Sequence, residues 1–159
     1  MRFGGLRNLL VKAISTFLFI GYLPLIPGTF GSIAGVGIFY LFGGSSRPGY
    51  FLFILCVAVL GLLTCGSAEK LFNRKDPGCI VIDEVMGMLI ALSFLPVEPK
   101  IVILAFLMFR VFDTFKVFPA ARLQNLHGAI GIIGDDLVAG IYANIVVQTV
   151  LRLNSFSAV

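Results

Sequence analysis

The sequence predicts an all-α protein, a multi-pass transmembrane helical bundle of about five to six helices. Hydrophobic residues make up 58% of its 159 residues and charged residues 13%, whereas soluble domains contain about 25% charged residues. The mean hydropathy is +1.03. Because no linker or internal repeat divides the chain, we expect a single domain over residues 1–159, with a basic interfacial or re-entrant helix in residues 1–23 and a helical core in residues 24–153.

The first half of the chain contains three predicted helices. Residues 8–23 form a short apolar helix, which ends because two prolines in residues 24–27 remove backbone donors and disfavour helix before each ring. The second helix covers residues 31–43 and is followed by a glycine- and serine-rich turn. Residues 50–66 are apolar throughout and form the clearest spanning helix, since about 20 residues cross the hydrocarbon core.

The second half contains three further predicted helices. Residues 80–95 form an apolar helix that carries an adjacent acidic pair, and the proline-containing turn 96–99 ends it. Residues 100–118 run back as the next helix. A glycine-containing loop over residues 119–134 leads to the last helix, which covers residues 135–153.

The polar segment 67–78 sets the predicted membrane orientation. It is the most basic loop, so the positive-inside rule places it in the cytoplasm, where its charged side chains are expected to be solvated. Counting crossings from this segment places the turns 44–49 and 96–99 outside and the loop 119–134 inside. We therefore expect a multi-pass membrane protein with its polar site at the cytoplasmic face.

Five of the eight acidic residues fall near the cytoplasmic ends of three predicted helices: Asp83, Glu84, Asp113, Asp135 and Asp136. Carboxylates at one depth repel one another unless a cation neutralises them. Carboxylate oxygens are ligands that Mg²⁺ prefers, so the pattern predicts a Mg²⁺ site. The sequence leaves open which member of each adjacent pair binds the metal.

Each acidic pair also has a simpler explanation. Asp83 and Glu84 would be satisfied by ion pairs to Arg110 or Lys116. One aspartate of the second pair would cap the last helix after Gly134, because aspartate is a preferred N-cap residue. Both explanations are tested by the structure below.

Two further groups of residues suit phosphate binding. Arg110, Asp113 and Lys116 follow one another at i+3 spacing and share one helix face, so two cations flank one carboxylate. The alternative is an intrahelical salt bridge from Asp113 to Lys116. Thr29 and Ser32 lie at the start of a predicted helix, where hydroxyl and backbone N–H groups would meet an anion, although a bare turn explains them equally well.

Composition also argues against other classes of function. The net charge of +4 is better explained by positive loops beside anionic lipid headgroups than by nucleic acid, because no basic run is interleaved with aromatic residues. The expected partner is therefore a lipid bilayer with anionic headgroups, and not nucleic acid. The three cysteines lack metal-type spacing and are expected to be inert.

Four segments together resemble the phosphatidylglycerophosphatase A family, in the order that the family has them. They are Pro27–Ser32, Asp83–Met88, Phe109–Lys116 and His127–Gly140. The resemblance implies a Mg²⁺-dependent, multi-pass membrane phosphatase of bacterial type that converts phosphatidylglycerophosphate to phosphatidylglycerol and inorganic phosphate, in phospholipid biosynthesis. One departure is Ala129, where a second glycine is expected after Gly128.

The resemblance also assigns roles to residues. The implied metal ligands are Asp83, Glu84, Asp113, Asp135 and Asp136. The implied phosphate-binding residues are Thr29, Ser32, Arg110 and Lys116, and the implied catalytic residues are Asp83, Asp113, Lys116 and Asp136. The nucleophile is water or one of the aspartates. A different class of function, a small cation transporter or channel lined by these acids, is the alternative, although transport favours polar residues spread through the membrane depth.

Overall fold

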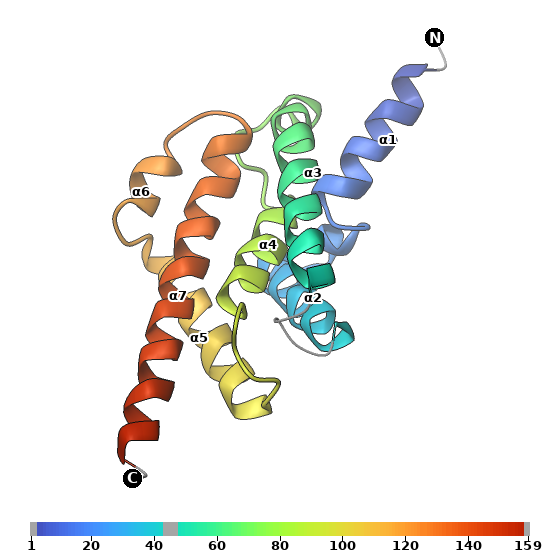
Figure 1. Cartoon of the computed structure of the whole chain (residues 1–159). Helices are drawn as coiled ribbons and strands as arrows, with labels where there is room; N and C mark the ends of the chain where they lie inside the picture. Colours follow the sequence, from blue (N-terminus) through green and yellow to red (C-terminus); the bar gives the residue numbers. More distant parts are fainter. Residues whose placement is uncertain (1–2, 43–47, 158–159) are drawn as a thin grey trace.

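The structure is a computed structural model and describes residues 3–42 and 48–157. In these residues the chain forms seven α-helices and one short 3₁₀ helix, and no strand (Figure 1). The elements are α1 (Phe3–Ser15), η1 (Ile20–Tyr22), α2 (Pro27–Leu41), α3 (Pro48–Phe72), α4 (Ile82–Ala91), α5 (Pro99–Phe115), α6 (Ala120–Leu123) and α7 (Ala129–Ser157). The all-α prediction is confirmed, with more helices than expected.

The two extra helices arise where the sequence predicted other structure. Helix α1 ends at Ser15, and Phe17, Leu18 and Phe19 then have positive φ angles of 44°, 54° and 69°. Left-handed residues cannot continue a right-handed helix, so the predicted helix 8–23 is wrong and η1 forms separately. Helix α6 forms inside the predicted loop 119–134.

The ends of the other helices also differ from prediction. Helix α2 begins at Pro27 instead of residue 31, because proline is well tolerated in the first turn of a helix, and α5 ends at Phe115 instead of residue 118. Helix α3 continues through the polar residues to Phe72 instead of ending at Gly66, and α4 covers only Ile82–Ala91 of the predicted 80–95. Helix α7 begins at Ala129, so Asp135 and Asp136 lie inside it and neither is its N-cap. The run Gly134-Asp135-Asp136 has the composition of a helix start, but the preceding turn is already helical because it packs against α3 and α6.

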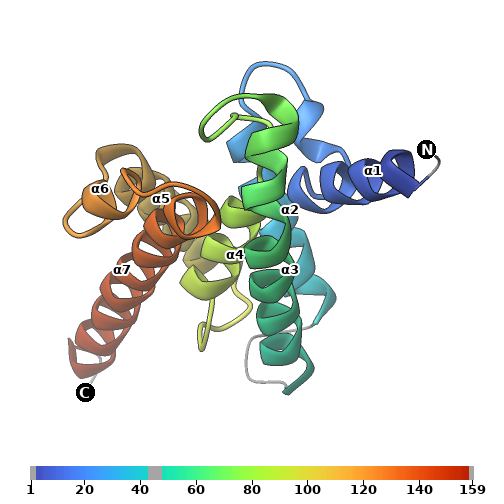
Figure 2. The ribbon, with the colours of Figure 1, turned by 90° about the horizontal axis from the view of Figure 1, so that it is seen from above.

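Helix α4 lies at the centre of the fold. It contacts α2, α3, α5 and α7, and Figures 1 and 2 show it between α3 and α7. Its 10 residues rise about 15 Å, half the thickness of a hydrocarbon core. Eight of them are buried: Ile82, Asp83, Val85, Met86, Gly87, Met88, Leu89 and Ala91. A helix this short and this buried depends on its neighbours for hydrogen-bond partners of the backbone groups at its ends.

Side chains from the two longest helices satisfy the C-terminal end of α4. The Tyr50 hydroxyl of α3 donates a hydrogen bond to the Leu89 carbonyl oxygen. The Asn144 side-chain amide of α7 donates to the carbonyl oxygens of Ala91 (2.9 Å) and Ser93 (2.6 Å). The last carbonyls of a helix have no partner within it, and leaving them unpaired inside a protein is costly. These bonds fix where α4 ends relative to α3 and α7.

Glycines allow α4 to approach its neighbours closely. A Cβ added to Gly140 of α7 would lie 2.3 Å from the Gly87 carbonyl oxygen of α4, and a Cβ on Gly87 would lie 2.7 Å from the Asp136 carbonyl oxygen. On the other side, a Cβ on Gly35 of α2 would lie 2.9 Å from the Met88 Cβ. Helices α2 and α7 therefore approach α4 at backbone distance, as small residues allow in membrane proteins.

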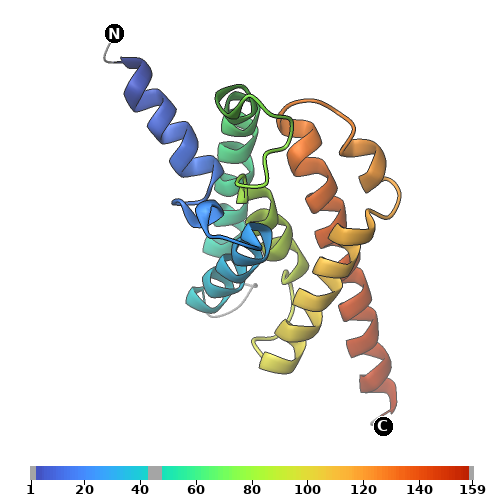
Figure 3. The same cartoon turned by 180° about the vertical axis from the view of Figure 1, so that it is seen from behind.

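Two helices in the described part of the chain are long and apolar enough to cross a membrane. These are α3, over Pro48–Phe72, and α7, over Ala129–Leu153. Many large apolar side chains of α3 are exposed, such as Leu52, Leu55 and Leu63. Figures 1 and 3 show the loop after α3, helix α6 and the start of α7 at one end of the molecule, and the α4–α5 turn at the other.

The glycine contact between α4 and α7 predicts a large effect of a single methyl group. In Gly140→Ala the new Cβ meets backbone, which cannot rotate away, so α4 and α7 must separate. We expect the melting temperature in detergent to fall by an amount corresponding to about 1–3 kcal/mol. Gly5→Ala in α1 is the control, because its Cβ would meet nothing within 4 Å. Equal melting of Gly140→Ala and wild type would contradict the close contact.

Candidate metal and phosphate site

Three carboxylates from two helices meet in a cluster that we call the carboxylate cluster, formed by Asp83, Glu84 and Asp136. One oxygen of each lies within 4.8 Å of the others. Asp83 is 6% exposed and Asp136 3% exposed. Gly87 follows Asp83, and Gly140 follows Asp136, at i+4 spacing, so the close contact of α4 with α7 lies one turn from the carboxylates. The helix crossing therefore brings these two acids together.

The cluster contains more negative charge than its surroundings neutralise. Two unit charges 4.8 Å apart repel by about 3.5 kcal/mol at an effective dielectric constant of about 20. Three such pairs sum to about 10 kcal/mol, comparable with the whole stability of a typical domain. The position of Asp83 and Glu84 in the first turn of α4 offsets part of this repulsion through the helix dipole. Lys116, 3.7 Å from Asp136, offsets a further part, and a bound cation or a shared proton would offset the rest.

Unpaired oxygen atoms favour a cation. Four buried carboxylate oxygens have no hydrogen-bond partner in the described part of the chain: Asp83 Oδ1, Glu84 Oε2, Asp135 Oδ1 and Asp136 Oδ2. No ion pair joins Asp83 or Glu84 to Arg110 or Lys116, all of which are described. The simpler explanation of that acidic pair is therefore wrong. A divalent cation, a hard acceptor of carboxylate oxygens, fits this set of donors.

Glu84 lies against the first turn of α2, where a glycine leaves room for it. A Cβ on Gly28 would lie 2.3 Å from Glu84 Oε1 and 3.6 Å from Arg110 Nη1. Thr29 is half-buried beside Gly28, and its hydroxyl makes no hydrogen bond within the described residues. The backbone N–H groups of Thr29 and Phe30 both donate to the Ile26 carbonyl oxygen. These two amides are therefore not free for an anion, contrary to the sequence-based expectation.

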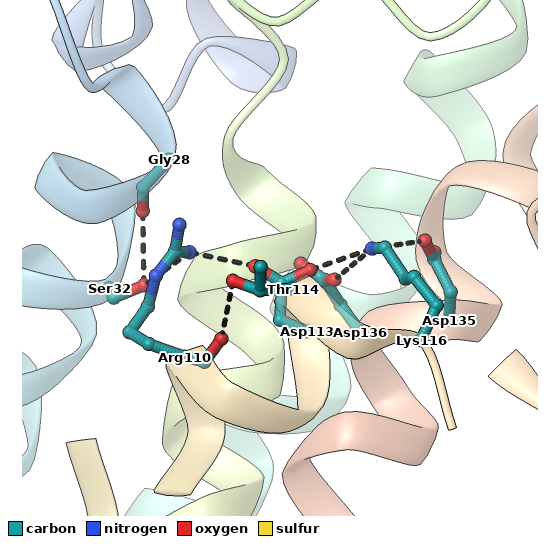
Figure 4. A network of polar contacts seen from close by, with 8 residues as sticks. All are labelled: Gly28, Ser32, Arg110, Asp113, Thr114, Lys116, Asp135 and Asp136. Carbon is teal, nitrogen blue, oxygen red and sulfur yellow. Dashed lines mark hydrogen bonds and ion pairs between the residues drawn. The ribbon is translucent and has the colours of Figure 1, made fainter. Parts of the chain in front are cut away.

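A chain of polar contacts runs from α2 through α5 to α7 (Figure 4). Arg110 Nη1 lies 3.4 Å from Ser32 Oγ and 2.9 Å from Asp113 Oδ2. Lys116 Nζ lies 2.6 Å from Asp113 Oδ1. The intrahelical salt bridge that the sequence left as an alternative is thus present. Asp113 has a cation on each oxygen and is not part of the carboxylate cluster.

Lys116 connects α5 to α7 through carboxylates. Its Nζ lies 2.7 Å from Asp135 Oδ2 and 3.7 Å from Asp136 Oδ1, besides Asp113. Lys116 is the C-cap of α5 with φ 46°, and this left-handed conformation ends the helix. Burial lowers the pKa of Lys116, but the charges of Asp136, Asp113 and Asp135 outweigh burial and raise it above the ordinary value. Lys116 therefore remains a cation at neutral pH.

Two acids that the sequence placed in a solvated segment contribute to this end of the fold. Glu69 accepts hydrogen bonds from the backbone N–H groups of Asp76 (3.0 Å) and Gly128 (2.9 Å), and so joins the end of α3 to the loop before α7. Removal from water raises the pKa of Asp76, the charge of Asp135 raises it further, and the charge of Lys116 lowers it. Asp76 thus lies within electrostatic range of the site. The Asp76 side chain is exposed, as predicted for this segment, whereas nothing in the local sequence distinguished the bridging role of Glu69 from that of a solvated acid.

The space beside Gly28 predicts how the cluster responds to a methyl group. Gly28→Ala places Cβ 2.3 Å from Glu84 Oε1, so the carboxylate must move while the backbone stays in place. We expect the affinity for Mg²⁺, measured as the rise in melting temperature with added metal, to fall about 10- to 100-fold. Gly37→Ala on the same helix is the control, since its Cβ meets nothing within 4 Å. Equal metal dependence of the two variants would remove Glu84 from the site.

Comparison with known proteins relates the chain to one family. Residues 13–151 match the model of the family described as phosphatidylglycerophosphatase A. The Escherichia coli (strain K12) phosphatidylglycerophosphatase A is 36% identical over 123 residues, which cover 76% of this chain and 72% of that protein. The Haemophilus influenzae phosphatidylglycerophosphatase A is 37% identical over 134 residues, 80% of each chain.

A third relative carries a different name. A Bacteroides thetaiotaomicron protein, named provisionally as a phosphatidylinositol-3-phosphatase, is 32% identical over 139 residues, 80% of this chain and 84% of its own. No solved structure matches the chain. The matched residues 13–151 include every member of the carboxylate cluster and of the polar chain, from Ser32 to Asp136. The chain therefore belongs to the phosphatidylglycerophosphatase A family.

Proposed function

We propose that this protein hydrolyses the terminal phosphomonoester of phosphatidylglycerophosphate, releasing phosphatidylglycerol and inorganic phosphate, with Mg²⁺ as its cofactor. Family membership supports the reaction. The observation that carries the proposal in the structure is the carboxylate cluster with its unpaired buried oxygens, which lies beside the Arg110 guanidinium. A cation site next to a phosphate-binding cation is the arrangement that phosphoryl transfer requires.

In this proposal Asp83, Glu84 and Asp136 hold the metal. When bound, Mg²⁺ neutralises charge on the phosphate oxygens and supports the attack on phosphorus. Asp135, with its unpaired Oδ1, is the next carboxylate available to the metal. Asp113 is better suited to hold Arg110 and Lys116 in place, because both of its oxygens already contact these cations. Of the five carboxylates that the resemblance implied as metal ligands, the proposal therefore retains Asp83, Glu84 and Asp136, keeps Asp135 as a further candidate and excludes Asp113.

The same proposal gives the cations and hydroxyls the task of binding phosphate. A guanidinium has five N–H donors, so Arg110 retains donors beyond those that face Ser32 and Asp113. Ser32 and Thr29 supply hydroxyls from α2 on the opposite side of the site. Lys116 offsets negative charge from the α7 side. Both a water molecule and an aspartate remain suitable as the nucleophile.

We further propose that α3 and α7 cross the bacterial cytoplasmic membrane and that the site lies at its cytoplasmic face. The loop after α3 contains Arg74 and Lys75 and lies at the same end as the start of α7 (Figure 1). Basic loops favour the cytoplasmic side. A phosphate at this level is reached by a lipid whose tails stay in the bilayer. A cation channel is less well supported, because Lys116 occupies the middle of the acidic group.

Phosphate release tests the reaction and the metal ligands. We expect purified protein in detergent to release phosphate from phosphatidylglycerophosphate with Mg²⁺ but not with a chelator. Asp83→Asn and Asp136→Asn should each lower kcat/KM by more than about 100-fold, because losing a ligand exceeds the cost of losing an outer partner. Glu98→Gln, at the opposite end of the fold, is the control. Phosphatidylinositol 3-phosphate serves as the competing substrate, and preferential turnover of it would overturn the proposed substrate.

Cysteine labelling tests the membrane orientation. Lys75→Cys and Lys100→Cys are made in a protein whose three native cysteines are replaced by serine. An impermeant maleimide should label Lys100→Cys in intact cells and Lys75→Cys only after the membrane is opened, because the basic loop is cytoplasmic. Labelling of both positions from the same side would contradict the proposed orientation.

A further inference from the structure

An apolar groove of about 250 Å³ lies between α2 and α5. Its lining consists of Ile33 and Val36 from α2 and Val102, Ile103 and Phe106 from α5. Ile33 and Ile103 are 51% and 59% exposed, whereas Val102 is 4% exposed. The groove therefore has a buried floor and an open side that faces whatever surrounds the helices. In a bilayer, hydrocarbon chains surround an apolar surface of this kind.

The polar site closes one end of this groove. Arg110 Nη1 and Ser32 Oγ lie 3.4 Å apart across the same two helices. On α2 the lining begins at Ile33, directly after Ser32, and continues to Val36, while on α5 it begins at Phe106, one turn (about 6 Å) before Arg110. A cation at one end and an apolar channel beyond it match an anionic lipid, with its phosphate at the cation and its chain in the channel.

A second apolar groove lies between α1 and α3 but does not have this character. It has a volume of about 260 Å³, and Ile14, Phe53 and Leu60 are among its lining residues. Two ionisable residues neighbour its lining in sequence, Lys12 before Ala13 and Asp83 after Ile82. Lys12 lies over the Phe72 ring, whereas Arg110 contacts Ser32 and Asp113 of the polar site. The groove between α2 and α5 is therefore the one that ends at a cation of the polar site.

We propose that the groove between α2 and α5 binds one acyl chain of the substrate lipid while a phosphate of the same lipid lies at Arg110. The identity of this lipid as phosphatidylglycerophosphate rests on the proposed function, but the binding of an acyl chain from an anionic phospholipid does not. The open side of the groove lets the lipid enter from the bilayer without leaving it. The groove then sets the preference of the enzyme for acylated substrate.

Kinetics with two substrates provide the first test. Val36→Phe fills the groove and should lower kcat/KM for phosphatidylglycerophosphate with two 16-carbon chains by about tenfold, mainly through KM. The deacylated analogue, glycerophosphoglycerophosphate, should be hydrolysed at an unchanged rate, because it has no chain to displace. Ile33→Trp is a second variant at an exposed position that folding does not depend on. Leu60→Phe in the other groove is the matched control and should change neither substrate.

Photo-crosslinking provides a test that does not need activity. The wild-type protein is placed in phosphatidylcholine vesicles that contain phosphatidic acid with a diazirine in one acyl chain. Labelled peptides should come from α2 and α5, and Val36→Phe should reduce this labelling by about tenfold while leaving labelling of α3 unchanged. Labelling without any phosphatase activity would overturn the proposed function and support the groove.

Other outcomes would overturn the groove proposal. One is an active enzyme in which Val36→Phe and Ile33→Trp leave the rate on long-chain substrate unchanged. Another is an equal loss of rate on the acylated and deacylated substrates, which would point to damage at the polar site. A third is a change of oligomeric mass in Val36→Phe together with absent lipid labelling, which would mean that a second copy of the chain covers this groove.

Discussion

The contact between α4 and α7 at Gly87 and Gly140 is the constraint on which the site depends. It allows the two backbones to approach so closely that a single Cβ would collide with a carbonyl oxygen. One turn away, Asp83 and Asp136 meet because their helices meet. The same crossing places Asn144 of α7 over the last carbonyls of α4. One packing contact thus determines both the position of a buried helix and the position of its charges.

The charges divide into a group that the protein neutralises and a group that it leaves open. Lys116 and Arg110 hold Asp113 from both sides, and Lys116 also holds Asp135. Within the carboxylate cluster, Lys116 lies 3.7 Å from Asp136, but no protein cation forms an ion pair with Asp83 or Glu84 in the described residues, so the repulsion favours a bound metal. The internal ion pairs hold these side chains in place. In the proposed function, the lipid phosphate would meet positive charge from both a bound metal and Arg110.

The surroundings of the site suit a substrate that stays in a bilayer. Helices α2 and α5 hold polar residues near one end and apolar residues in the turns that follow. A phospholipid has the same division between its headgroup and its chains. The wider packing of the chain is consistent with this, since large apolar side chains of α3 face outward. In the proposed function, phosphate binding and acyl-chain binding share α2 and α5, whereas the metal ligands come from α4 and α7.

The sequence by itself determined the helical class and the family, because composition, hydropathy and four short motifs are local properties of the chain. It also identified Asp83, Glu84, Arg110 and Lys116 as candidate functional residues. It failed at helix ends such as the start of α7, because the turn before Asp135 is helical through packing that no local preference reports.

Tertiary structure decided which charges pair and which remain free. Charges that the sequence places at a similar depth form ion pairs only where the packing of their helices brings them close together. That packing depends on contacts between residues far apart in the chain. Asp113 therefore forms ion pairs with two cations, Arg110 and Lys116. Asp136 instead lies in the carboxylate cluster with Asp83 and Glu84 of α4. The role of Glu69 as a bridge between α3 and the start of α7, and the apolar groove beside Arg110, follow from the same three-dimensional packing.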